Sequence, residues 1–227
     1  MADPIPIIGG TGALGYGLAV RWAAAGEAVV IGSRQLERAQ EAAERVATAA
    51  AAGEVEGLEN AEAAGRGPIV FLTVPFRAQS ETLTNLQGAL SEGQILVDCT
   101  APLAASISGK ATRTVGVWQG SAAEQAKEMV PDGVAVVSAL HTVSAAGLAE
   151  GDAIDEDILV CGDRKADKAR VAELIDRIEG LRAVNAGSLE MARIAESLTA
   201  LLLSINSRYK ARAGIKVTGL PDRDPWS

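Results

Sequence analysis

The sequence predicts an α/β protein, a Rossmann-like doubly wound and mostly parallel sheet with a small helical C-terminal subdomain. Three observations support this prediction. Short apolar runs alternate with longer amphipathic runs, which is typical of β-α-β units around a parallel sheet. The stretch GGTGALG, residues 9–15, follows the first apolar run and opens the first amphipathic one. Near residue 188 the pattern changes to a long stretch of helical spacing.

The elements follow in this order along the chain. In the first helix Leu14, Leu18 and Trp22 recur at helical spacing, and Gly26 is placed to end it. In the second helix Glu41 and Arg45 form an i, i+4 pair. We expect strands at residues 5–10, 28–32, 69–74, 95–100, 134–140, 158–162 and 181–187, and helices at residues 14–25, 36–52, 77–90 and 165–179.

The C-terminal part, from Ser188 to Lys216, is expected to form one long helix or two shorter ones. We therefore divide the chain into a nucleotide-binding domain, residues 1–184, and a small C-terminal domain, residues 185–227. One feature opposes the predicted sheet. Pro4 and Pro6 flank the first strand, which should be central, and a proline there removes a ladder hydrogen bond.

Composition limits the classes of function. The chain has 227 residues, 48% of them apolar, which is enough for a sizeable core. Its net charge of −8 argues against nucleic acid or an anionic membrane as partner. No secretory signal and no apolar run long enough to span a bilayer is evident. Cys99 and Cys161 form no CxxC motif, and both are expected to be buried near strand ends. We expect a cytoplasmic protein.

The glycine-rich loop matches the pattern G-x-G-x-x-G with Gly10, Gly12 and Gly15. The first glycine permits the tight turn, the second lets a pyrophosphate approach the backbone, and the third lets the helix pack on the strand. Free N–H groups at the helix N-terminus, together with the Thr11 hydroxyl, would bind the anion. The alternative is a glycine-rich turn without a ligand, which the flanking strand and helix make the weaker interpretation.

The end of the second strand favours NADP over NAD. A protein that binds NAD normally has Asp or Glu there for the ribose hydroxyls. This chain has Ser33 and Arg34 instead, with Arg38 one helical turn later. A serine and two arginines would bind a 2′-phosphate through charge-assisted hydrogen bonds. The alternative, two solvated arginines at a helix start, leaves the missing acid unexplained.

No general acid is evident. The two tyrosines, Tyr16 and Tyr209, lack a lysine four residues later, and no carboxylate lies near the single histidine, His141. His141 follows an apolar strand, so it can reach the ligand crevice and donate to a ligand atom, or it is simply a buried structural histidine. A hydride acceptor with a flavin-like ring would need no protein proton donor, since the two cofactors carry the chemistry.

The C-terminal part carries a local excess of positive charge. Arg208, Lys210, Arg212 and Lys216 occur within residues 208–218 without any acid. Upstream, Arg193, Ser197 and Thr199 are expected on roughly one side of a helix, where they could bind a phosphate, a carboxylate or a polar heterocycle. The alternative is a solvated basic surface with back-bonded hydroxyls.

These stretches together resemble the coenzyme F-420 (F420)-dependent NADP oxidoreductases, also called NADPH:F420 reductases. The resemblance is carried by IGGTGALGYGLA, VIGSR, FLTVPF, VVSALHTV, VCGD, GLRAVNAG, RIAESLTALLLSIN and GIK, in this order over almost the whole chain. SALHT together with R-x-x-x-S-x-T is the most specific part, because a general Rossmann enzyme need not have either.

The resemblance implies reversible hydride transfer between NADP(H) and the deazaflavin F420 in a homodimer, with no residue acting as acid or base and no metal. F420 is strongly anionic, so we further suggest that Arg208, Lys210 or Arg212 meets its glutamate tail. The implied deazaflavin residues are His141, Arg193, Ser197 and Thr199. The implied NADP residues are Gly10, Thr11, Gly12, Ala13, Leu14, Gly15, Ser33, Arg34, Arg38, Val74 and Pro75.

Two alternatives remain at this point. An imine or carbonyl reductase of the pyrroline-carboxylate or ketopantoate type would need a larger helical C-terminal domain and a clear proton donor. A non-catalytic NADP sensor would bind the nucleotide without turnover and without affinity for a deazaflavin.

Overall fold

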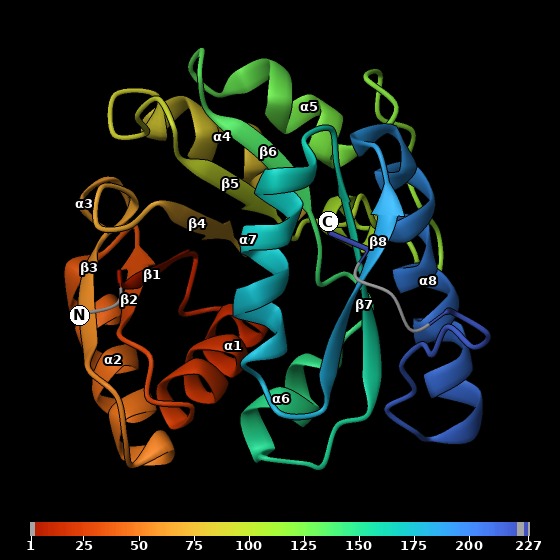
Figure 1. The fold of residues 1–227 in the computed structure, drawn as a ribbon, viewed down its shortest axis with the longest axis horizontal. Helices are drawn as coiled ribbons and strands as arrows, with labels where there is room; N and C mark the ends of the chain where they lie inside the picture. Colours follow the sequence, from red (N-terminus) through yellow and green to blue (C-terminus); the bar gives the residue numbers. More distant parts are fainter. Residues whose placement is uncertain (1–2, 222–224, 227) are drawn as a thin grey trace.

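The structure is a computed structural model that describes residues 3–221, 225 and 226. One eight-stranded sheet runs through the molecule in the order β3-β2-β1-β4-β5-β6-β7-β8 (Figure 1). The first six strands are parallel, β7 is antiparallel to β6, and β8 is parallel to β7. The strands are β1 (Ile5–Ile8), β2 (Val29–Ser33), β3 (Val55–Glu59), β4 (Ile69–Leu72), β5 (Ile95–Asp98), β6 (Ala135–Ser138), β7 (Glu156–Gly162) and β8 (Leu181–Gly187).

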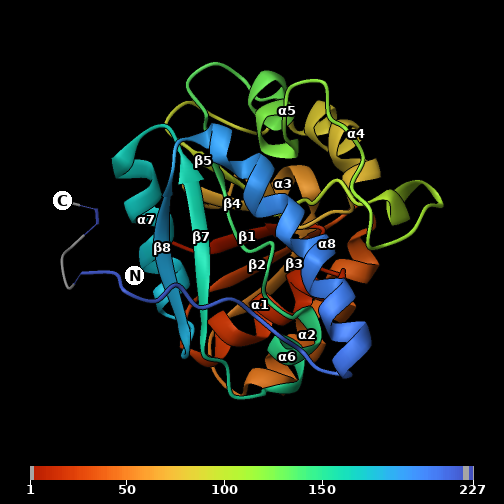
Figure 2. The same ribbon diagram turned by 90° about the vertical axis from the view of Figure 1, so that its right-hand side faces the viewer.

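Helices cover both faces of the sheet, so the predicted doubly wound α/β fold is confirmed. Alternate residues of the central strands enter two separate cores, as the two-residue period of a strand requires. One core lies under α1 (Ala13–Ala24), α2 (Leu36–Ala50), α6 (Ala145–Glu150) and α7 (Lys165–Asp176). The other lies under α3 (Asn60–Ala64), α4 (Phe76–Leu86), α5 (Ala122–Met129) and the start of α8 (Ala192–Tyr209). Figure 2 shows α8 crossing the outside of the molecule. The two short 3-10 helices are η1 (Ala104–Ile107) and η2 (Leu189–Met191).

Pro6 fits inside a central strand because of where its nitrogen faces. The Ile5 N–H donates to Ala28 O on the β2 side at 2.8 Å, so the nitrogen of the next residue faces the β4 side. Pairing with β4 begins only at Ile7, which is opposite Phe71. Pro6 instead lies against Gly67, where a Cβ would come within 2.9 Å of the proline Cδ. The proline therefore removes no ladder hydrogen bond, and the conflict noted in the sequence disappears.

Five elements were not predicted: β3, α3, η1, α5 and α6. β3 reads VEGLE, which lacks an apolar run because it is a half-exposed edge strand. Its Gly57 is required by packing, since a Cβ there would lie 2.4 Å from the backbone of Ala39 in α2. β8 has the predicted boundaries, residues 181–187. The boundaries of the other predicted elements differ from the expected ones by a few residues. The C-terminal stretch forms a single long helix, α8, rather than two.

The C-terminal part is tied closely to the sheet. The division proposed between residues 184 and 185 falls within β8, so the first residues of the proposed C-terminal domain belong to the common sheet. After α8 the chain returns over β7, where the Asp157 N–H donates to Ile215 O at 2.7 Å. Within the described ranges 3–221 and 225–226, no helix is long and apolar enough to cross a membrane.

Candidate functional site

The glycine-rich loop lies between β1 and α1. The strand order reverses at β1, because β2 and β3 lie on one side of it and β4 and the later strands lie on the other. Gly10 makes the tight turn, with its N–H donating to Ile7 O at 3.2 Å and Gly32 O at 3.0 Å. A Cβ on Gly15 would lie 2.5 Å from Thr73 Oγ1 and 2.7 Å from Gly10 Cα. Each glycine therefore permits a close approach that a larger residue would prevent. Such a switch point is where open α/β sheets bind their ligands.

The N-terminus of α1 is free to bind an anion. Gly12 is its N-cap, and no side chain caps the helix or places a carboxylate in its first turn. The first helical hydrogen bond runs from Tyr16 N–H to Gly12 O at 2.8 Å. The N–H groups of Ala13, Leu14 and Gly15 precede it and have no partner within the helix. Together with the helix dipole they form a site suited to a phosphate.

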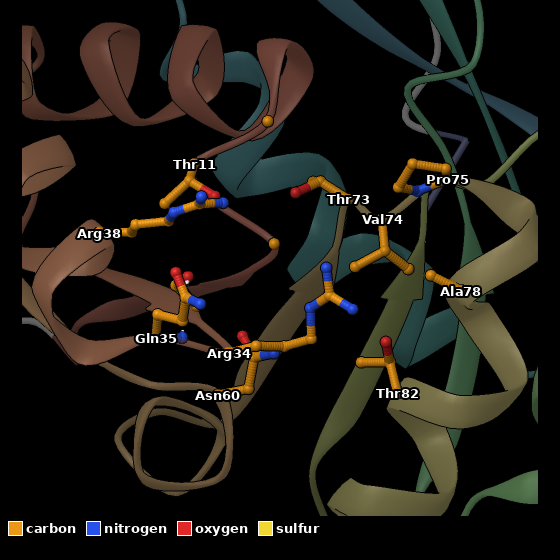
Figure 3. Close-up of a pocket in the computed structure, with 13 residues that line it drawn as sticks. Thr11, Arg34, Gln35, Arg38, Asn60, Thr73, Val74, Pro75, Ala78 and Thr82 are labelled. Atoms are coloured by element: carbon orange, nitrogen blue, oxygen red, sulfur yellow. Dashed lines mark hydrogen bonds between the residues drawn. The ribbon is translucent and has the colours of Figure 1, made fainter.

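A pocket of about 210 Å3 extends from this loop to the end of β2 (Figure 3). Figure 3 shows the side chain of Arg38 directed toward Thr11, and that of Arg34 extending across the pocket toward Val74. Neither guanidinium has an ion pair or a hydrogen bond within the described residues. Two unpaired cations beside a free helix N-terminus suit a ligand with more than one phosphate. The pocket is lined by Gly9, Thr11, Gly12, Ser33, Arg34, Gln35, Arg38, Asn60, Thr73, Val74, Pro75, Ala78 and Thr82.

The opposite wall of this pocket comes from β4 and α4. Thr73, Val74 and Pro75 follow β4, and Pro75 is the N-cap of α4. Thr73 is held by its N–H and its hydroxyl, which donate to Ile8 O at 2.9 and 3.0 Å. Of the NADP residues expected from the sequence, seven line the pocket, while Gly10, Ala13, Leu14 and Gly15 form the loop and helix start behind it.

His141 lies three residues beyond β6, at the same carboxyl edge of the sheet. The residue before it, Leu140, is buried and has a φ of 69°, an uncommon conformation for a non-glycine residue. Burial lowers the pKa of His141 to about 4, although a hydrogen bond to the Thr100 backbone opposes the shift. The imidazole is therefore neutral. Its Nε2 is buried without a partner. A neutral imidazole has one N–H and one acceptor nitrogen, and the donor role expected for His141 from the sequence stays a prediction.

A buried polar network surrounds the Thr100 segment. Asp98 ends β5, and its two carboxylate oxygens accept from the Gln79 side chain and from Thr100 N–H, the latter at 2.7 Å. Burial raises the Asp98 pKa to about 6. Gln79 also donates to Ala122 O at 2.9 Å, which connects α4 to the start of α5. Sequence reasoning missed this network because its members are distant along the chain.

Glu196 in α8 is the second buried acid of this region. Its two oxygens accept from the N–H groups of Ala122 and Ala123 at 2.9 and 3.1 Å, so it holds α8 against the N-terminus of α5. Burial raises the Glu196 pKa to about 8, although these two hydrogen bonds favour the charged form. Glu196 lies between Arg193 and Ser197, at a position that the motif R-x-x-x-S-x-T leaves unspecified.

The expected arrangement of the α8 residues is partly wrong. Arg193 and Ser197 lie on the exposed side, where Arg193 pairs with Glu190 at 2.7 Å and Ser197 donates to Arg193 O at 2.7 Å. Thr199 is two residues past Ser197, about 200° around the helix. It faces inward, and its hydroxyl donates to His141 O at 2.8 Å. Thr199 and His141 therefore form one unit, which the other two residues do not join.

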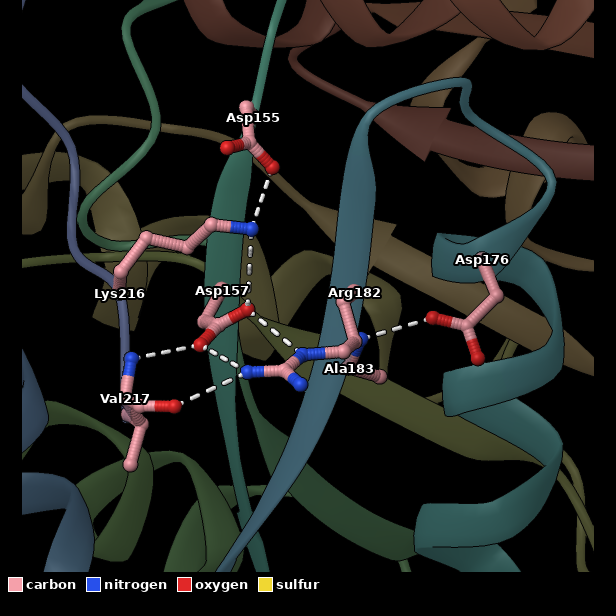
Figure 4. Close-up of polar contacts among 7 residues, drawn as sticks. All are labelled: Asp155, Asp157, Asp176, Arg182, Ala183, Lys216 and Val217. Atoms are coloured by element: carbon pink, nitrogen blue, oxygen red, sulfur yellow. Dashed lines mark hydrogen bonds and ion pairs between the residues drawn. The ribbon is translucent and has the colours of Figure 1, made fainter. Parts of the chain in front are cut away.

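The basic C-terminal segment is only partly free. Arg212 pairs with Glu150 and Asp152 at 2.7 and 2.5 Å. Figure 4 shows Lys216 paired with Asp155, and Asp157 held by Arg182 and by Val217 N–H. The Arg182 side chain keeps the pKa of the Asp157 carboxyl below its usual range. These contacts fasten the segment to β7 and β8. The suggested role in binding a glutamate tail therefore does not fit Arg212, while Arg208 and Lys210 have no such partner in the described part of the chain.

Comparison with known proteins identifies the family. A family model described as "NADP oxidoreductase coenzyme F420-dependent" matches residues 4–102. The chain is 42% identical to the F420-dependent NADP reductase of Methanothermobacter thermautotrophicus over 99% of this chain and 98% of the relative. It is 39% identical to that of Methanocaldococcus jannaschii over 95% of this chain and 98% of the relative. The chain belongs to the F420-dependent NADP oxidoreductase family.

Solved structures agree with the fold of an F420-dependent NADP oxidoreductase. A putative F420-dependent NADP reductase from Arthrobacter sp. FB24 has a TM-score of 0.78 at 24% identity, over 93% of this chain and 96% of that one. An imine reductase from Bacillus cereus has a TM-score of 0.57 at 16% identity. This chain spans 61% of that enzyme, so the rest of the imine reductase has no counterpart here.

Both cysteines are buried and free, as expected. Among residues 3–221, 225 and 226, no group of His, Cys, Asp and Glu could hold a metal ion. The pocket residues that were not expected from the sequence are Gly9, Gln35, Asn60, Thr73, Ala78 and Thr82. Asn60 follows β3, which the sequence did not predict, and Thr73 falls inside the predicted strand 69–74, so neither stood out as a pocket residue. Both residues directly follow a strand at the carboxyl edge of the parallel sheet, where open α/β sheets bind their ligands.

Proposed function

We propose that this protein catalyses reversible hydride transfer between NADP(H) and the deazaflavin F420. The observation that supports it best is the pocket at the end of β2. There Arg34 and Arg38 have no partner among the described residues and lie beside the free N-terminus of α1. This arrangement fits a dinucleotide with a 2′-phosphate, and the relatives are F420-dependent NADP reductases by name. When both are bound, the nicotinamide C4 and the deazaflavin C5 exchange the hydride.

In this proposal the chain positions two rings. The loop of residues 10–15 binds the pyrophosphate, Ser33, Arg34 and Arg38 bind the 2′-phosphate, Val74 lines the nucleotide pocket, and Pro75 lies near the nicotinamide. His141, Arg193, Ser197 and Thr199 are proposed for the deazaflavin, with residues 185–227 completing its pocket. Rigid positioning of the reacting carbons is the main contribution that such a site can make.

No residue is proposed as an acid or base for the hydride step. The neutral state of His141 agrees with this, because an imidazole with a pKa of about 4 has no imidazolium proton to donate near neutral pH. The proton that accompanies deazaflavin reduction would then come from solvent.

We further propose a cytoplasmic homodimer. Two free cysteines suit a reducing compartment. One side of α8 exposes Ile194 and Leu201, at 53% and 55% of their surface, and Trp118, which lies outside α8, is 98% exposed. Apolar side chains at such helical spacing on a surface are typical of a protein interface.

The test is to mix the purified protein with oxidised F420 and NADPH and to follow the visible absorbance of the deazaflavin, with NADH as control. Bleaching with NADPH and little with NADH supports the reaction and the role of Arg34 and Arg38. Equal bleaching with both contradicts the NADP preference. No bleaching, although NADPH binds, contradicts the proposed acceptor.

A further inference from the structure

Two polar side chains at one end of the pocket have no partner within the part of the chain that the structure describes. Asn60, the first residue of α3, has a buried Oδ1 without a hydrogen bond. Thr82, in the middle of α4, is 6% exposed. Its hydroxyl makes no hydrogen bond within the described residues. Both residues line the pocket, and Figure 3 shows the Thr82 hydroxyl directed into it. Buried polar groups are nearly always paired, so a ligand is the natural partner of both.

The usual structural roles do not explain these two residues. An asparagine at a helix start normally caps the helix or forms a turn with its own backbone, but Asn60 makes no such bond. A helical threonine normally donates to the carbonyl four residues earlier. Thr48 and Thr84 do so, at 2.8 and 2.9 Å, whereas Thr82 does not. The Thr82 hydroxyl is therefore left free on the side of α4 that faces the pocket.

The sequence makes room for Asn60 in this position. A Cβ on Gly32 would lie only 2.9 Å from Asn60 Oδ1, so a larger residue in β2 would push the carboxamide away. Gly32 precedes Ser33, where the 2′-phosphate is proposed to bind. The carboxamide is thus held directly beside the ribose that carries this phosphate.

The base is attached to that ribose, so it must lie close to the Asn60 carboxamide as well. The pocket there offers the planar guanidinium of Arg34 and the apolar side chains of Val74 and Ala78. These groups suit the faces of a flat heteroaromatic ring. A carboxamide and a hydroxyl suit its edge, since asparagine pairs with the amino group and the adjacent ring nitrogen of adenine.

We propose that Asn60 and Thr82 recognise adenine by hydrogen bonds to the edge that carries its exocyclic amino group. This inference rests on the proposed binding of NADP(H) in the pocket. It adds that the site selects the base as well as the 2′-phosphate. Selection follows because an analogue without that edge leaves both buried groups unpaired.

The test is a comparison of dissociation constants, measured by calorimetry, for NADP⁺ and 1,N6-etheno-NADP⁺, in which that edge is blocked. We expect the wild-type protein to bind NADP⁺ about tenfold more tightly or better, a typical value for lost hydrogen bonds. Asn60→Ala and Thr82→Val should each weaken NADP⁺ binding and bring the ratio of the two constants closer to one. Thr82→Ser keeps the hydroxyl and should keep the ratio.

Arg38→Ala is the matched control for the rest of the nucleotide. It should weaken both ligands by the same factor and leave their ratio unchanged. The inference is overturned if the wild-type protein binds both ligands equally, or if Asn60→Ala and Thr82→Val, folded by circular dichroism, keep the wild-type ratio. Failure of the wild-type protein to bind NADP⁺ at all would instead overturn the proposed function.

Discussion

Arg38 is the residue whose role in cofactor choice can be tested most directly. It has no partner in the described protein and points along the pocket toward Thr11 (Figure 3). A hydrogen bond to a charged group contributes about 1.5–3 kcal/mol, so Arg38→Ala should weaken NADPH binding roughly 10- to 100-fold. NADH has no 2′-phosphate and should be little affected. The measurement is KM for both nucleotides.

The control for this prediction is Arg45→Ala on the same helix. Arg45 lies over the Tyr16 ring at 4.6 Å and does not line the pocket, so its loss should change neither KM by more than a small factor. An equal rise in KM for NADPH and NADH in Arg38→Ala would show that Arg38 does not bind the 2′-phosphate.

His141 allows a second prediction at the scale of one residue. His141→Ala should raise KM for F420 by about tenfold, the usual cost of a lost hydrogen bond at a buried site, and should leave KM for NADPH unchanged. Because the folded-state pKa is lowered to about 4, the imidazole is neutral throughout pH 5–8. KM for F420 should therefore show no histidine titration in that range. An inflection near pH 6.5 in the wild-type protein that is absent from His141→Ala would contradict the neutral state.

At the scale of elements, Glu196 joins α8 to α5 through two backbone N–H groups. Its folded-state pKa is raised to about 8, above its usual value of 4.5. Between these values the folded protein keeps a proton that the unfolded chain releases. The free energy of unfolding should therefore fall as pH rises through this range, by up to about 1.4 kcal/mol per pH unit.

The measurement is the free energy of unfolding by urea between pH 6 and 8, for the wild-type protein and Glu196→Gln. The pH range starts at 6 because burial also raises the pKa of Asp98, to about 6. At lower pH the titration of Asp98 would change the free energy of unfolding in the same direction as that of Glu196. The variant cannot titrate, so its stability should change less with pH. Parallel pH curves for the two proteins would show that Glu196 is not the titrating group. Glu196→Ala should cost about 1–3 kcal/mol at pH 6, because two buried N–H groups lose their partners.

The elements that sequence reasoning found are those with strong local patterns. β1, β4 and β5 are apolar because both their faces are buried, and α1 and α2 show a helical period. β3 was missed because an edge strand needs no continuous apolar run, and α6 because six residues give little periodicity. The loop of residues 10–15 and the arginines after β2 were found because they are close along the chain. Asn60 and Thr82 come from two other helices, and only the fold places them in the same pocket.

The whole molecule exposes one surface that the sequence did not reveal. Ile194, Leu198, Leu201 and Ile205 follow at intervals of three and four along α8, and the first and third are more than half exposed. From residue 194 to 207 the only charged residue of the helix is Glu196, which is buried. A net charge of −8 would keep the rest of the surface soluble, so a helix side without charge is unusual here.

If two copies meet at this surface, a charge in its centre should separate them. Leu201→Glu would bury a carboxylate in an apolar contact, which costs far more than a typical dimer contact contributes. We expect the wild-type protein to sediment as a dimer and Leu201→Glu as a monomer with an unchanged circular dichroism spectrum. Glu62→Gln, an exposed change on α3, which lies on the opposite side of the molecule from α8 in Figure 1, should leave the dimer intact. A dimer that persists in Leu201→Glu would place the interface elsewhere. Ser197 and Arg193, which are proposed for F420, also lie on the exposed side of α8. The monomeric variant should therefore show a raised KM for F420. Its affinity for NADPH should stay the same, because NADPH is proposed to bind at the other end of the sheet edge.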